Sequence, residues 1–147
     1  PKRLRSMTSK PDSAPANELR GEVDLYLEGE RFVLRPSYTA IQNIERLTGK
    51  TMVQLAVAAD ENALSQDDCA AVVGEMIRAW GVAVDHPVAK MVNDRRIGEL
   101  LFEHGLMAVM PRITLVLTMA ATGGCLASGE VKTAGTIPAT SDIPAVD

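Results

Sequence analysis

Few side chains in this 147-residue chain are of the types that do chemistry, and their spacing matches no common site. The histidines are His86 and His104, and the cysteines are Cys69 and Cys125. No two of these side chains have the separation that places metal ligands together on one helix, so we expect no metal site. Cys69 falls on an apolar helical stripe without a partnered base, which favours a small core residue over a nucleophile.

Two polar clusters allow both a chemical and a structural interpretation. The pair Asp67-Asp68 could serve acid–base chemistry, but carboxylates are also favoured in the first turn of a helix. The segment from Asn93 to Arg96 could hold an anion, or it could be a solvated turn. The sequence has no phosphate-binding loop, dinucleotide fingerprint, HExxH or G-x-S-x-G motif. We therefore expect a protein that is not an enzyme and binds no cofactor.

The composition favours one domain with an aliphatic, Met-containing core. Hydrophobic residues make up 46 % of the chain, aromatic residues only 3 %, and the formal net charge is −4. Nucleic-acid binding requires a basic face, so an acidic chain disfavours it. Two cysteines and the lack of an apolar signal segment indicate a cytoplasmic protein with free thiols. The uncharged run 113–128 is too short and too polar to span a membrane, and we interpret it as a buried helix followed by a loop.

The hydrophobic pattern predicts an α+β fold that is mostly helical, with an N-terminal two-stranded β-hairpin followed by four to five helices. Apolar and polar residues alternate over 23–27 and again over 31–35, as in half-buried strands. We place the hairpin turn at 29–30, which pairs Leu27 with Phe32 and gathers the apolar side chains on one face. A turn one residue earlier would pair Leu27 with a glutamate.

The same pattern predicts a single domain over residues 21–124. Residues 1–20 are rich in Ser, Pro, Lys and Asn, and we expect them to be disordered. Residues 125–147 contain few hydrophobic side chains, and we expect them to form a disordered tail.

Cap signals define the first two helices. Ser37 is placed as an N-cap and Gly49 as a left-handed C-cap, with Leu47 on the buried stripe between them. Thr51 and Gln54 form a capping box for a second helix that is apolar nearly all round. Such a helix is either buried between two layers or exposes an apolar surface that tends to bind other molecules.

The third helix is predicted over about 66 to 80, with Gly81 as its end. We expect Val82 and Val84 to be buried in a connector, and Asp85 to cap the next helix at His86-Pro87.

Two open alternatives concern the C-terminal helices. The segment at Asn93 is either part of one long helix or the start of a new one. In both cases a buried stripe is expected at Ile97, Leu100 and Leu101, with Glu99 and Glu103 outside. Pro111 should kink the last helix or divide it into two pieces.

The hairpin, the capped helix and its Gly-Lys-Thr end together resemble the tail assembly chaperones of tailed phages and gene transfer agents, some of which are labelled tail tube proteins. The resemblance covers about 18–124, with a break at 81–94. The matching residues are Asn17 to Val23, Leu27 to Gly29, Leu34 to Ser37, Ile44-Glu45, Leu47 to Gly49, Ile97, Glu99 to Leu101, Glu103 and Gly105-Leu106.

The resemblance implies a protein that binds the tape-measure protein and keeps it soluble while the tail tube polymerises in the host cytoplasm. An alternative is a structural tail protein that is incorporated in the particle and associates with other copies through the hairpin edge at 23–27. A third is a small adaptor unrelated to phage.

We expect partner binding from apolar side chains of the second and third helices. The candidates are Met52, Leu55, Val73, Met76, Ile77 and Trp80. Met and Trp recur on surfaces that accept apolar helices. Ordinary core filling is the alternative for these residues.

Overall fold

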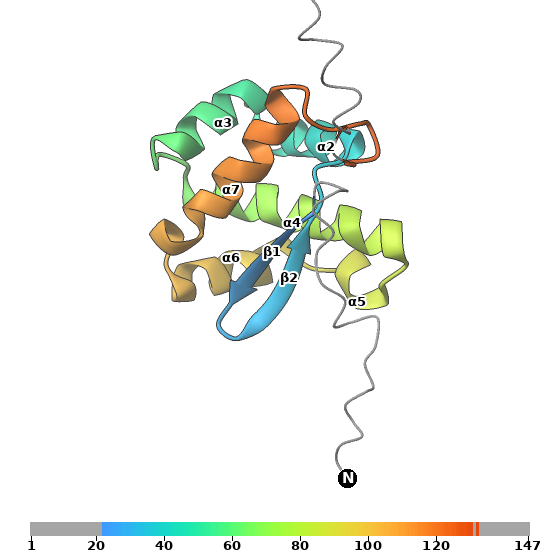
Figure 1. Ribbon diagram of the computed structural model, residues 1–147. Helices are drawn as coiled ribbons and strands as arrows, with labels where there is room; N and C mark the ends of the chain where they lie inside the picture. Colours follow the sequence, from blue (N-terminus) through green and yellow to red (C-terminus); the bar gives the residue numbers. More distant parts are fainter. Residues whose placement is uncertain (1–21, 131, 133–147) are drawn as a thin grey trace, which may run out of the picture.

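The computed structural model describes residues 22–130 and Lys132, and it has a two-stranded antiparallel sheet followed by six helices (Figure 1). The elements are β1 (Val23–Leu27), β2 (Glu30–Leu34), α2 (Tyr38–Thr48), α3 (Met52–Asp60), α4 (Gln66–Val84), α5 (Pro87–Lys90), α6 (Asp94–His104) and α7 (Leu106–Ala121). The predicted α+β, mostly helical fold is confirmed. The predictions for residues 1–20 and 133–147 lie outside the described residues.

The 19-residue helix α4 is the centre of the fold. It contacts α2, α5, α6, α7 and strand β2, while α7 also packs against α3. In the view of Figure 1, α4 crosses the molecule, with α2 and α3 on one side of it and α5 and α6 on the other. Because neighbours cover several sides of α4, most of its length is buried.

The hairpin turn differs from the prediction. Leu27 pairs with Glu30 and Leu25 pairs with Phe32, so the turn is Glu28-Gly29. Both turn residues have positive φ, 50° and 83°, as a type I′ turn requires. We rejected this turn because it pairs Leu27 with a glutamate, and that reason was wrong. The observed register differs from the predicted one by two residues, so every side chain stays on the same face of the hairpin.

The predicted caps of α2 and α3 are confirmed. Ser37 Oγ accepts a hydrogen bond from the Ala40 amide at 3.1 Å, and Gly49 adopts the left-handed conformation at φ 71°. Thr51 and Gln54 form both hydrogen bonds of the capping box. Helix α3 is neither fully buried nor fully exposed, since its buried residues lie on one side only.

The predicted end of α4 at Gly81 is wrong, because the helix continues to Val84. Gly81 is instead where α5 crosses closely: a Cβ there would lie 2.5 Å from the Lys90 amide nitrogen. Val82 and Val84, which we expected to be buried, are exposed on the last turn. Asp85 ends α4 in the left-handed conformation, and the N-cap of α5 is His86.

The structure shows where a helix begins near Asn93 and whether Pro111 divides the last helix. Asn93 starts a new helix, and its Oδ1 accepts hydrogen bonds from the amides of Arg95 and Arg96 at 2.7 and 3.2 Å. Pro111 lies inside α7, which remains one helix rather than two pieces. Pro111 is exposed, as is Met107, whose carbonyl loses its helical donor and can turn to solvent.

The packed structure continues beyond residue 124, where we had placed the start of the tail. The Tyr38 amide donates to the Ala127 carbonyl at 2.8 Å, and Arg35 Nε donates to the Ser128 carbonyl at 2.8 Å. The same guanidinium forms a buried ion pair with Glu22 at 2.8 Å. Arg35 therefore joins the start of β1 to the segment after α7.

Candidate functional site

The structure buries five of the six residues that we expected to bind a partner. Leu55, Val73 and Met76 have no exposed surface, Ile77 is 1 % exposed and Trp80 is 7 % exposed. They fill the core, as the alternative interpretation had it, and cannot contact a partner unless the core opens. Only Met52 is partly exposed, at the start of α3.

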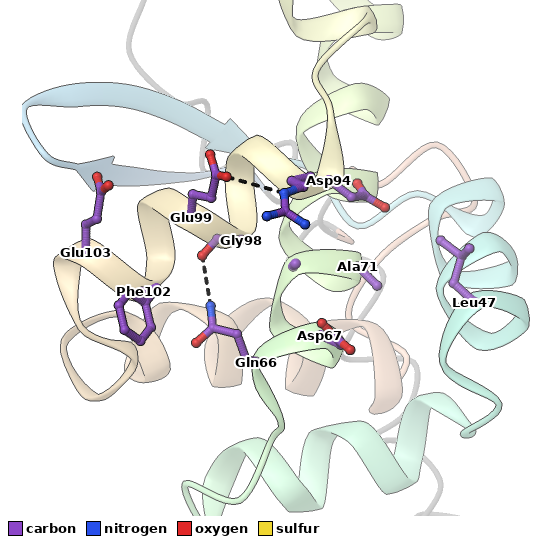
Figure 2. Close-up of a pocket in the computed structure, with 11 residues that line it drawn as sticks. Leu47, Gln66, Asp67, Ala71, Asp94, Gly98, Glu99, Phe102 and Glu103 are labelled. Carbon is purple, nitrogen blue, oxygen red and sulfur yellow. Dashed lines mark hydrogen bonds and ion pairs between the residues drawn. The ribbon is translucent and has the colours of Figure 1, made fainter.

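A groove in the described surface lies between α2, α4 and α6, and we call it the α4–α6 groove (Figure 2). Its volume is about 620 Å³, and it is open to solvent. The lining residues are Leu47 from α2, Gln66, Asp67, Ala70 and Ala71 from α4, and Asp94, Arg95, Gly98, Glu99, Phe102 and Glu103 from α6.

Helical spacing explains why these side chains share one surface. On α6 the lining positions recur at intervals of four residues, and this places them on the side opposite the buried stripe. The floor consists of Ala70, Ala71 and Gly98, which are among the smallest residues. Gln66 Nε2 donates to the Gly98 carbonyl at 2.9 Å and ties the start of α4 to α6. Because the floor lacks long side chains, no floor residue fills the groove.

Two large apolar side chains stand at the ends of the groove. Phe102 is 74 % exposed and Leu47 is 57 % exposed. Figure 2 shows Phe102 at one end and Leu47 at the other, with Asp67 and Ala71 between them. The predicted burial of Leu47 is wrong, because its side chain lines the open groove instead of the core.

The rim of the groove is acidic. Four carboxylates line it, at Asp67, Asp94, Glu99 and Glu103, against the single guanidinium of Arg95. Arg95 pairs with Glu99 at 3.3 Å. Asp67 and Glu103 have no ion-pair partner among the described residues, so their charges are open to a bound molecule.

Asp94 forms an ion pair with Arg78 of α4. The Arg78 Nη2 to Asp94 Oδ1 distance is 2.9 Å, and Glu75 also pairs with Arg78. Burial alone would lower the pKa of Arg78, but hydrogen bonds and charge from Glu75 and Asp94 outweigh it and raise the pKa. Gly74 leaves room for this network, since a Cβ there would clash with Asp94 Oδ1.

Neither thiol is activated. Burial and the neighbouring Asp68 carboxylate raise the pKa of Cys69 to about 11. Burial also raises the pKa of Cys125, although Lys132 opposes the shift. Both groups therefore favour the protonated thiol, which is the poorer nucleophile.

Among the residues that the structure describes, no group of three or more His, Cys, Asp or Glu side chains is placed to hold a metal ion. No helix among 22–130 has the length and apolar character needed to cross a membrane.

Comparisons of the chain with models of protein families, with curated proteins and with solved structures found no match. Function must therefore be inferred from the α4–α6 groove, from the charge of the chain and from the resemblance in its sequence.

Proposed function

We propose that this chain is a tail assembly chaperone of the phage or gene transfer agent type. It binds the tape-measure protein in the host cytoplasm and keeps that protein soluble while tail tube subunits polymerise. The observation that carries the proposal is the α4–α6 groove, which exposes Phe102 and Leu47 beside small residues and an acidic rim.

The physical task of such a chaperone matches this surface. A tape-measure protein contains long apolar helices, and apolar surface exposed during assembly leads to aggregation. A chaperone must cover that surface with apolar side chains and still remain soluble itself. Exposed Phe102 and Leu47 supply apolar contact, and a formal net charge of −4 favours solubility.

The resemblance in the sequence is the second support. Asn17 to Gly21 of the match lie outside the described residues. The other matching residues lie in or next to the hairpin, in α2 with its two caps, and in α6 and its junction with α7.

The alternative is a structural protein of the tail. The described sheet has two strands, and each strand has one edge without a strand partner among the described residues. Such an edge can pair with another copy. This alternative predicts that the protein is found in purified particles, whereas a chaperone is absent from them.

Co-expression with the tape-measure protein encoded beside this chain tests the proposal. The tape-measure protein is expressed alone and with this chain, and its soluble fraction and co-purification are measured. We expect it to be insoluble alone and to become soluble in a complex with this chain. If it stays insoluble and this chain is recovered in purified particles, the structural alternative replaces the chaperone.

A further inference from the structure

We infer that the α4–α6 groove binds an amphipathic α-helix whose apolar stripe is flanked by Lys or Arg. The inference deepens the proposed function by naming the chemistry of the bound segment, and it rests on that function for which protein carries the segment. Three properties of the groove support it: the type of its walls, the position of its apolar side chains and the sign of its rim.

The walls favour a helix as the occupant. All lining residues belong to helices α2, α4 and α6, whose interior peptide groups are already hydrogen-bonded within each helix. The Gly98 carbonyl accepts an additional bond from Gln66. The groove therefore offers few free backbone groups to an extended peptide, and a bound segment must satisfy its own backbone, as a helix does.

The dimensions fit a short helix. Along α6 the lining runs from Asp94 to Glu103, which corresponds to about 14 Å, or about two and a half helical turns of a partner. Small residues at Ala70, Ala71 and Gly98 let a third helix approach closely, because the distance between helix axes depends on the side chains at the contact. Phe102 and Leu47 then provide an apolar anchor at each end.

The charges select a basic partner. Asp67 and Glu103 lack an ion-pair partner among the described residues, and Glu99 is paired only with the exposed Arg95. An acidic helix would be repelled by these carboxylates, whereas Lys or Arg beside the apolar stripe would pair with them. Binding should consequently weaken as the salt concentration rises.

The probe is a synthetic, fluorescein-labelled peptide of about 18 residues, long enough to form a helix, with a Leu stripe flanked by Lys. A second peptide carries Glu at every Lys position. Kd is measured by fluorescence anisotropy with the full chain. We expect the Lys peptide to bind roughly tenfold or more tightly than the Glu peptide. Equal affinity for the two peptides would overturn the inference.

Surface variants locate the site. Phe102→Asp should weaken binding of the Lys peptide by roughly tenfold or more. The matched control is Met91→Asp, which changes a side chain that is 81 % exposed but lies outside the groove, and it should leave Kd unchanged. If Met91→Asp weakens binding as much as Phe102→Asp, the groove is not the site.

Glu103→Lys distinguishes a charge effect from a loss of folding. A lysine is tolerated there because it lies in the last turn of α6, near the negative end of the helix dipole. This variant should lose affinity for the Lys peptide and gain affinity for the Glu peptide, which unfolding cannot produce. A parallel loss for both peptides would contradict the inference.

Two further outcomes separate the inference from the proposed function. If Phe102→Asp solubilises the tape-measure protein as well as the unmodified chain does, the function stands and the inference fails. If the chain does not solubilise the tape-measure protein but binds the Lys peptide through Phe102, the function fails and the inference stands. If ultracentrifugation shows a dimer that Phe102→Asp disrupts and no peptide binds, the occupant is a second copy and the inference is overturned.

Discussion

Replacing Gly81 with alanine tests the close crossing of α4 and α5. An added Cβ would lie 2.5 Å from the Lys90 amide nitrogen and 2.8 Å from both the carbonyl carbon and the Cβ of Ala89. The first distance is about 0.9 Å short of an ordinary 3.4 Å contact. Backbone atoms cannot rotate away as a side-chain tip can, so α5 must move outward.

The magnitude follows from two opposing effects. Overpacking of this kind costs about 1–3 kcal/mol, whereas glycine to alanine inside a helix gains about 1 kcal/mol. We therefore expect Gly81→Ala to lose up to about 2 kcal/mol of unfolding free energy. The matched control is Gly98→Ala on α6, where the added Cβ would lie at an ordinary 3.4 Å from Ala70 Cβ. That variant should be neutral or gain up to about 1 kcal/mol.

Urea denaturation followed by circular dichroism measures both free energies. Fluorescence adds a local probe, because Trp80 is the one tryptophan of the chain and its ring lies 5.1 Å from that of His86, centre to centre. Gly81→Ala should change the emission of the native state, and Gly98→Ala should not. If Gly81→Ala is as stable as Gly98→Ala, the close approach of α5 to α4 is refuted.

Three further variants test other features. Arg35→Ala removes the ion pair of the buried Glu22 carboxylate and should cost up to about 5 kcal/mol of unfolding free energy in urea denaturation, part of which the double variant with Glu22→Leu should restore. The protonated Cys69 thiol stabilises the folded state fully below its ordinary pKa of 9.0, and this contribution is lost as the pH rises toward about 11. The difference in unfolding free energy between the unmodified chain and Cys69→Ala should therefore shrink by about 2 kcal/mol between pH 8 and 11. Asn93→Ala should lose about 1 kcal/mol, and hydrogen exchange should show faster opening of the first turn of α6.

The parts of the fold that the sequence predicts well are those set by neighbouring residues. Ser37 and Thr51 act as N-caps because each hydroxyl accepts from an amide only three residues away. Glu99 and Glu103 are exposed as expected, since the stripe that alternates with them points into the core. Local hydrogen bonds and helical periodicity are sufficient for such features.

The errors come from contacts between distant segments. Gly81 is typical of a helix end, but it lies inside α4. A glycine fits there because the backbone at Lys90 lies against it. Likewise, the chain after residue 124 contains few hydrophobic side chains, yet Arg35 and Tyr38 hold it by hydrogen bonds. No local pattern reveals which distant backbone supplies such a contact.

The candidate site was missed for a related reason. Apolar periodicity identifies which side chains could be buried but not whether another element covers them. Met76 and Trp80 are apolar and covered, whereas Leu47 is apolar and lines the open groove. One signal was present: Phe102 lies outside the buried stripe of α6, so the helical periodicity predicts that this aromatic side chain is exposed.

The most direct measurement of the chaperone claim uses purified components. Denatured tape-measure protein is diluted into buffer with and without this chain, and aggregation is followed by light scattering. The account predicts that this chain suppresses scattering as its concentration reaches that of the tape-measure segments it binds, and that the two proteins then elute as one complex. Equal scattering with and without this chain, and separate elution, would contradict it.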